Sequence, residues 1–337
     1  MIRPSRRVRI LFGGLAASLG VVLGVAALLA VLGGEPKSDV SASTQTTGTG
    51  LPVWVRNIPV RRPGEAEAAP AAEVFRPVGG TAIDGTLYMI DAVAGSLLVL
   101  PPEGGVQEVP LGTPGGGSLR APRFSDLVAT GTGVLLVADL ANGRLWNYAT
   151  DGRFLGSFLS DEQRRRSALG RPSGVAVDRD GRILVTDIED QRVKVFNKSG
   201  VLVQSFGERG FAPGSFSFPT DVAADTQGRI FVADSENRRV QVFDSGGRFL
   251  RAFRDTDTPE GLVLPRSLAV DRYGLVHVVD TFGERVSAFT AEGVFVGSYG
   301  FGAGGERSLS LPEGVAVAGP LLVIGDRGNG RLVVFSR

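Results

Sequence analysis

Residues 219–234 read Pro219-Thr-Asp-Val-Ala-Ala-Asp225, then a turn that contains Gly228, and then Ile230-Phe-Val-Ala-Asp234. Self-similarity at a fixed period indicates a repeat architecture and is the first feature to look for in a chain of this length. The pattern recurs at 172–187, 265–280 and 312–326, and in more divergent form at 77–91 and 124–139. The sequence therefore contains six copies of one structural unit.

The second apolar run of each unit ends in aspartate, and every unit but the last contains four such runs. In the copy quoted above, the third run is Arg239-Val-Gln-Val-Phe243 and the fourth is Phe249-Leu-Arg-Ala-Phe253. The six strand-ending aspartates lie 46–48 residues apart, at Asp91, Asp139, Asp187, Asp234, Asp280 and Asp326. Four strands joined by Gly and Asp turns are typical of a β-propeller blade. Second strands such as Ile230-Phe-Val are continuously apolar, as expected for strands covered on both faces.

The sequence thus predicts an all-β fold, a six-bladed β-propeller with four-stranded blades that spans residues 51–337. The blades are expected to start near residues 76, 123, 171, 218, 264 and 311. The sixth repeat ends at Val333-Val-Phe335 without a fourth strand, whereas an extra apolar run occupies residues 51–60. We expect this run to pair with the sixth repeat and close the ring, because an unpaired edge would otherwise remain.

The repeats resemble a known family. The segment from Phe206-Gly-Glu-Arg-Gly to Phe-Pro219, followed by Val-Ala-Ala-Asp225 and Val-Ala-Asp-Ser-Glu-Asn-Arg-Arg-Val-Gln-Val-Phe243, is similar to the NHL repeat. This resemblance covers roughly residues 77–337 and implies a six-bladed propeller. It also implies binding as the usual role and, in bacterial members, an export signal or a membrane anchor. Related six-bladed propellers include metal-dependent lactonases and an amidating lyase.

The N-terminus predicts the compartment. Residues 10–34 carry no charge and are long enough to span a bilayer as a helix. The arginines precede this run, at Arg3, Arg6, Arg7 and Arg9. The positive-inside rule then leaves residues 1–9 as a basic cytoplasmic tail and residues 35–50 as a flexible linker outside. We expect a single-pass protein of the bacterial inner membrane with a periplasmic propeller. A cleaved signal peptide is the alternative, although its apolar region is usually shorter.

Composition excludes several classes of site. The chain has 337 residues, no Cys, one His, 36 Lys+Arg and 35 Asp+Glu. Disulfides, thiolate metal sites and sites that need several imidazoles are therefore excluded. The near-zero net charge makes nucleic acid an improbable partner, despite Arg164-Arg165-Arg166, which follow Asp161-Glu162. The single histidine, His277, lies on a second strand and is expected to be packed in the core.

An aspartate–arginine spacing of five residues recurs in five blades. We interpret these residues as ion pairs that build the blades, because a catalytic pair is needed once and a structural pair once per blade. The first blade has Ser96 where the arginine is expected. The predicted pairs are Asp139/Arg144, Asp187/Arg192, Asp234/Arg239, Asp280/Arg285 and Asp326/Arg331.

Charged positions that break the repeat are the candidate binding residues. They lie where the first strands begin and should meet around one mouth of the central channel, because every blade places its inner strand in the same way. They are Arg123, Asp126, Arg171, Asp221, Arg266 and Glu313. The alternative is that Asp126 and Asp221 only cap turns. Because both signs of charge are present, we expect a mixed-charge protein or peptide surface as the partner.

These features favour a membrane-tethered, extracytoplasmic binding or scaffolding propeller without catalysis, cofactor or bound metal. The alternative is a metal-dependent hydrolase of the lactonase type, built from Glu, Asn and Asp around one cation. No such ligand set can be recognised by spacing in the sequence.

Overall fold

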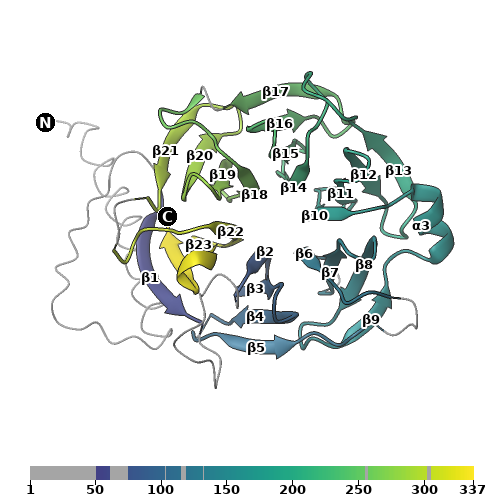
Figure 1. The fold of residues 1–337 in the computed structure, drawn as a ribbon, viewed down its shortest axis with the longest axis horizontal. Helices are drawn as coiled ribbons and strands as arrows, with labels where there is room; N and C mark the ends of the chain where they lie inside the picture. Colours follow the sequence, from purple (N-terminus) through teal and green to yellow (C-terminus); the bar gives the residue numbers. More distant parts are fainter. Residues whose placement is uncertain are drawn as a thin grey trace, which may run out of the picture.

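Figure 1 shows six four-stranded sheets around a central channel in the computed structural model of this protein. The structure describes residues 51–60, 75–102, 104–114, 119–131, 133–254, 257–301 and 305–337. Each sheet is a blade whose strands run outward from the channel in chain order, except in the last blade. The predicted all-β, six-bladed propeller with four-stranded blades is confirmed.

The first three blades follow the chain from residue 77. Their strands are β2 (Pro77–Ile83), β3 (Thr86–Asp91), β4 (Ser96–Leu100) and β5 (Gln107–Pro110); β6 (Phe124–Ala129), β7 (Leu135–Asp139), β8 (Arg144–Tyr148) and β9 (Phe154–Ser157); and β10 (Pro172–Val177), β11 (Ile183–Asp187), β12 (Arg192–Phe196) and β13 (Leu202–Phe206). One short helix, α3 (Asp161–Ser167), joins the second and third blades.

The last three blades complete the circle. Their strands are β14 (Pro219–Ala224), β15 (Ile230–Asp234), β16 (Arg239–Phe243) and β17 (Phe249–Arg254); β18 (Pro265–Val270), β19 (Leu275–Asp280), β20 (Arg285–Thr290) and β21 (Phe295–Tyr299); and β22 (Pro312–Ala318), β23 (Leu321–Asp326), β24 (Arg331–Ser336) and β1 (Val53–Pro59). A 3-10 turn, η2 (Arg327–Asn329), joins β23 to β24.

The hydrophobic core lies between neighbouring blades. Every residue of β11 and β15 is buried, because each second strand is covered on both faces by the adjacent blades. Between the fourth and fifth blades, Phe253 and Phe289 stack with their ring centroids 5.1 Å apart. The fourth strands lie at the outer rim (Figure 1) and are less buried, and in β13 every second residue is exposed. Burial is thus lower in the outermost strand than in the second strand of a blade.

The ring closes where the two ends of the propeller meet. Strand β1, the run expected to close it, pairs antiparallel with β24, with Trp54 opposite Phe335. The Asn57 side-chain amide also donates to the Glu306 carbonyl at 2.7 Å. The predicted cytoplasmic tail, membrane anchor and linker, residues 1–50, lie outside the described residues. Among the residues described, no helix is long and apolar enough to cross a membrane.

A β-bulge in every first strand prepares the functional site. In five of the blades the register between first and second strands shifts around the second residue of the first strand, as between Phe124 and Asp126 and between Pro219 and Asp221, and in the first blade it shifts between Val78 and Thr81. A bulge bends its strand and re-aims the side chains beside it. The side chains at the start of each inner strand are thereby directed to the channel.

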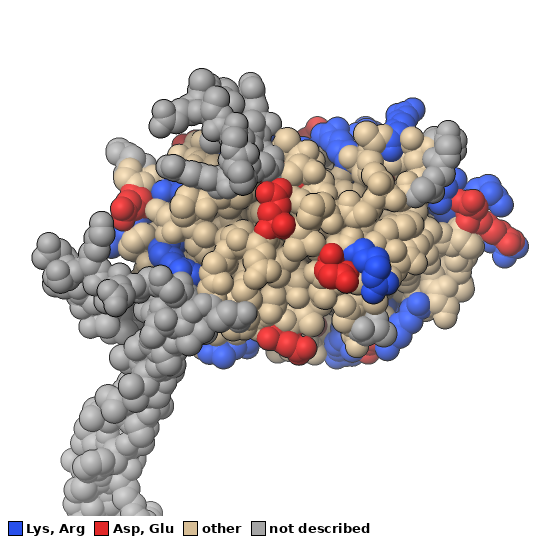
Figure 2. All heavy atoms as spheres, turned by 90° about the horizontal axis from the view of Figure 1, so that it is seen from below, with Lys and Arg blue, Asp and Glu red and all other residues tan. Residues whose placement is uncertain are grey.

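The outer surface carries interspersed charges. Figure 2 shows the edge of the propeller with acidic and basic residues scattered among uncharged ones. The three consecutive arginines lie on α3, where Arg166 forms an ion pair with Glu162 at 2.5 Å. This arrangement is typical of an ordinary solvated surface rather than of a phosphate-binding patch.

Candidate functional site

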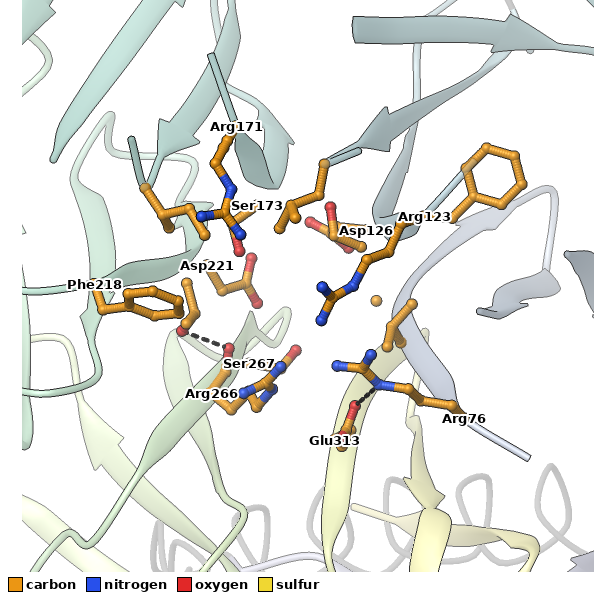
Figure 3. Close-up of a pocket in the computed structure, with 17 residues that line it drawn as sticks. Arg76, Arg123, Asp126, Arg171, Ser173, Phe218, Asp221, Arg266, Ser267 and Glu313 are labelled. Carbon is orange, nitrogen blue, oxygen red and sulfur yellow. Dashed lines mark hydrogen bonds and ion pairs between the residues drawn. The ribbon is translucent and has the colours of Figure 1, made fainter. Parts of the chain in front are cut away.

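A cavity of about 210 Å³ opens at the mouth of the channel where the first strands begin (Figure 3). It is lined by all six residues chosen from the sequence as binding candidates: Arg123, Asp126, Arg171, Asp221, Arg266 and Glu313. We call this space the mouth cavity. The structure adds Arg76, which sequence reasoning missed. The sequence does indicate Arg76, because it directly precedes Pro77 as Arg123 precedes Phe124 and Arg171 precedes Pro172. The equivalence is difficult to recognise because the first repeat is the most divergent.

The buried aspartates at the ends of the second strands position three of these arginines. The Asp91 carboxylate accepts the backbone N–H of Arg76 at 3.1 Å. Asp139 and Asp187 accept those of Arg123 and Arg171 at 3.0 and 2.9 Å. All three aspartates are fully buried. A buried carboxylate needs such donors. These hydrogen bonds therefore fix the backbone of the arginine before each of these first strands, and its side chain points into the channel.

Four guanidinium groups converge in the mouth cavity. Figure 3 shows Arg76, Arg123, Arg171 and Arg266 directed toward its centre. Arg76 forms an ion pair with Glu313 at 2.6 Å. Among the described residues, the guanidinium groups of Arg123, Arg171 and Arg266 have no hydrogen-bond or ion-pair partner. Burial lowers the pKa of Arg266, and the nearby Arg76, Arg123 and Arg327 act in the same direction, against Glu313.

Glu313 on β22 is committed to arginines. Its Oε2 accepts from Arg76 Nε at 2.6 Å, and its Oε1 from Arg327 Nη1 at 2.8 Å. Burial raises the pKa of this carboxyl, but the positive charges of Arg266 and Arg76 outweigh that effect and hold the pKa below its usual range. Glu313 therefore balances part of the positive charge and has little capacity left for a cationic ligand.

Asp126 and Asp221 are buried and bound to backbone amides. The Asp126 oxygens accept from Leu127 N at 2.8 Å and from Val175 N of the next blade at 2.7 Å. Asp221 repeats this arrangement with Val222 N and, in the following blade, Leu268 N, both at 2.7 Å. Each aspartate thus links two neighbouring blades. Both aspartates line the mouth cavity, as predicted, but their oxygens are engaged by backbone amides.

The two carboxyl groups also meet each other across the channel. Burial, reinforced by the charge of Asp221, raises the pKa of Asp126 well above its usual value. Burial also raises the pKa of Asp221, to about 6, against the amide hydrogen bonds that lower it. Asp126 and Asp221 form the floor of the mouth cavity, because a second cavity of about 320 Å³ on the far side of them is lined by the inner strands.

Only three of the five predicted ion pairs form. Asp234 pairs with Arg239 at 2.7 Å, Asp280 with Arg285 at 3.4 Å and Asp326 with Arg331 at 2.7 Å.

The other two predicted pairs, Asp139/Arg144 and Asp187/Arg192, are replaced by different contacts. Arg144 turns outward to Asp161 at 2.9 Å and lies over the Trp146 ring, while the Trp146 indole donates to Asp139. Lys194 takes the place of Arg192 and reaches Asp187 at 2.7 Å. The aspartate is kept in every blade because it binds backbone amides, and its side-chain donor varies.

The mouth cavity does not fit a divalent cation. Calcium and magnesium need several carboxylate, amide or carbonyl oxygens around one point, whereas here the three carboxyl groups are bound to amides or arginines and four guanidinium groups face inward. The described residues contain no group of three or more His, Cys, Asp or Glu side chains arranged for a metal. His277 is fully buried and bridges Asp271 at 3.1 Å and the Tyr299 hydroxyl at 3.0 Å, outside the mouth cavity.

Comparison with protein families identifies the repeat. The NHL repeat model matches residues 169–196 and 216–243, which cover β10–β12 and β14–β16. The chain carries NHL repeats. This match confirms the resemblance to the NHL repeat over these two stretches, and the matched repeat spans the first three strands of a blade. No curated protein matches the sequence significantly.

Solved structures with different activities share the fold. A gluconolactonase from Xanthomonas campestris superposes with a TM-score of 0.57 at 17% identity, over 85% of this chain and 97% of that chain. Virginiamycin B lyase from Staphylococcus aureus gives 0.56 at 14%, over 83% and 87%. A nidogen/laminin complex gives 0.54 at 15%, over 73% and 86%. At these identities the likeness establishes the fold alone.

Proposed function

We propose that this NHL propeller is a non-catalytic binding module whose mouth cavity captures an acidic group of a protein or peptide partner. The carrying observation is that Arg123, Arg171 and Arg266 converge there without partners among the described residues. Arginine recognises carboxylates through paired N–H donors. Unpaired guanidinium groups that share one cavity repel one another, and an anion relieves that repulsion.

The charge balance supports an acidic rather than a mixed-charge partner. Glu313 is bound to two arginines, and Asp126 and Asp221 are bound to backbone amides. The arginines are thus the charged groups available to a ligand. We therefore propose an acidic partner, whereas the presence of both signs of charge among the six residues led us to expect a mixed-charge surface.

The size of the mouth cavity supports a projecting group. Pockets for whole small molecules usually enclose about 300–1,000 Å³, whereas this one holds about 210 Å³. It suits an Asp or Glu side chain or a chain terminus. Around it, Val263 and Phe282 are exposed where the fifth blade meets the same face, since Val263 N donates to Asp280 at the end of β19. These side chains offer apolar contact to residues flanking the acid.

We also propose that a membrane tether precedes the propeller. Residues 10–34 would anchor the chain in the bacterial inner membrane with the N-terminus in the cytoplasm and the propeller outside, in the periplasm. The support is the uncharged length of this run and the arginines before it. Protease treatment of spheroplasts should degrade the propeller of the intact chain, and protection of the propeller would contradict this orientation.

A metal-dependent hydrolase is the second candidate, supported by the gluconolactonase of the same fold. The residues that line the mouth cavity do not fit the divalent cation that such a hydrolase needs. Thermal melting with calcium or with EDTA separates the two functions, because a ligand of the native state raises stability with its concentration. We expect no shift in the melting temperature with either addition. A calcium-dependent rise would favour the hydrolase.

Calorimetry with small anions tests the binding function. Sulfate and succinate should bind the wild-type propeller, and Arg171→Ala should weaken both by about tenfold, a loss of about 1.4 kcal/mol. The matched control is Arg165→Ala, which removes an exposed arginine from α3, at the outer rim of the propeller and outside the lining of the mouth cavity (Figure 1). Equal affinity of wild type and Arg171→Ala would contradict the proposed site.

A further inference from the structure

The floor of the mouth cavity consists of two acids, although the proposed ligand is itself acidic. Asp126 and Asp221 both line the cavity and come close enough to share a hydrogen bond. Two carboxylates at that distance repel strongly unless a proton lies between them. An anion held directly above them adds to the repulsion. The site therefore needs a means of removing negative charge from its floor.

The fold prevents the two acids from moving apart. Each carboxyl accepts two backbone N–H groups, one within its own blade and one from the next, at 2.7–2.8 Å. Both side chains are buried. The second and fourth blades therefore hold the carboxyl groups at a fixed separation, and protonation is the remaining way to lower their repulsion.

Glycines in the neighbouring blades make room for this arrangement. At the position of Asp126 and Asp221, the first and third blades have Gly79 and Gly174. A Cβ at Gly79 would overlap Oδ1 of Asp126, and one at Gly174 would lie 2.5 Å from the Cα of Asp221. The absence of a Cβ at Gly79 and Gly174 therefore leaves the space that Asp126 and Asp221 occupy in the channel.

We propose that the mouth cavity takes up its anion together with a proton, which the Asp126–Asp221 pair holds, so that the site binds acids more tightly at mildly acidic pH. This inference rests on the proposed function and names how that same site is regulated. Positive charge from the arginines attracts the anion, and the proton removes a negative charge from the floor. Loss of the proton adds a negative charge directly below the ligand.

Charged residues from several blades surround the Asp126–Asp221 pair. Arg76, Arg123 and Arg171 precede the first strands of the first three blades, Arg266 lies on β18, and Glu313 lies on β22. The fourth blade contributes Phe218 and Thr220 beside Asp221 itself. Burial raises the pKa of Asp221 to about 6 and that of Asp126 well above its usual value, which places the titration of the pair in the range from pH 5 upward. His277 lies outside this cavity and does not contribute.

Sulfate is the probe that tests this coupling, because it does not itself titrate between pH 5.5 and pH 8. Calorimetry in buffers of different ionisation enthalpy gives the number of protons taken up on binding. We expect the wild-type propeller to take up a fraction of a proton, up to one. The Kd of sulfate should then rise with pH by up to about tenfold per unit, as linkage of one proton requires.

Two variants isolate the pair. Asp221→Asn should bind sulfate with a Kd that changes little between pH 5.5 and pH 8. Asp244→Asn, a matched change in an exposed turn between β16 and β17, should keep the wild-type pH dependence. If Asp221→Asn fails to fold, the proton count on the wild-type protein still decides, because it needs no variant.

The outcomes distinguish the two proposals. Sulfate binding with no proton uptake and a constant Kd would overturn the proton coupling and leave the binding function intact. Absence of sulfate binding at every pH would overturn both. Proton uptake that persists when both acids are replaced, in Asp126→Asn/Asp221→Asn, would show that a group outside the pair takes up the proton and would also overturn the coupling.

Discussion

Aspartate has two roles in this propeller, and its neighbours determine which. Asp91, Asp139 and Asp187 receive the backbone amides before the first strands and fix the arginines of the mouth cavity. Asp126 and Asp221 also receive amides, yet they face each other. The spacing of the repeat predicts where each aspartate lies along its strand. It does not predict the contact between two residues that are 95 positions apart in sequence.

Arg266 is expected to serve binding at a cost in stability. Burial and three nearby arginines disfavour its charge, against Glu313, and a half-buried charge without an ion-pair partner destabilises the folded state. Arg266→Met, which keeps much of the packing, should raise the melting temperature and weaken sulfate binding. As a control, Arg229→Met removes an arginine paired with Asp225 and Glu292 and should lower the melting temperature. A drop in stability for Arg266→Met would show that Arg266 packs the blade instead.

The raised pKa of Asp221 predicts a pH dependence of stability. Its folded value is about 6 against 3.8 in the unfolded chain, so the folded state binds more protons between these values. This contribution is complete below about pH 4 and is lost as pH rises through 6, by about 3 kcal/mol. Urea unfolding of wild type from pH 4 to 8 should show that loss, and Asp221→Asn should show a shallower one. Parallel profiles would contradict the shift.

At the scale of the element, the first strand and its bulge create the site. The proline and the apolar run predict the strand, and the bulge after its first residue turns the next side chain to the channel. The six candidates could therefore be grouped at one mouth from spacing alone. Their pairing could not, because Glu313 meets Arg76 only after the ring has closed the sixth blade against the first. Arg76 could not be recognised as equivalent to Arg123 and Arg171, because the first repeat diverges from the others.

Strand β1 is expected to fasten the ring. It pairs with β24 along its length, and its apolar side chains Val55 and Ile58 pack against the core between the sixth and first blades. A chain that starts at Phe75 loses this edge and should melt about 10 °C below one that starts at Gly50, given the apolar surface that β1 buries. Circular dichroism measures the difference. Equal melting temperatures would mean that β1 is not needed for closure.

At the scale of the whole molecule, six similar blades produce one asymmetric cavity. The backbone repeats around the channel, but the residues that begin the first strands do not. Arginine precedes the first strands of blades one to three, and the third residue of the first strand is glycine in blades one and three and aspartate in blades two and four. The repeat therefore supplies a rigid frame, and the positions that break it supply the chemistry. This division explains why the fold could be predicted closely and the ligand only by its charge.

We expect the mouth cavity to bind an anion through its arginines. Selenate is the analogue of sulfate whose position can be seen directly by anomalous scattering. In crystals of the propeller soaked with selenate near pH 6, we predict an anomalous peak within hydrogen-bond distance of the guanidinium groups of Arg123 and Arg171, which should be absent in crystals of Arg171→Ala. Peaks confined to surface arginines such as those of α3, with none at the channel mouth, would contradict the account.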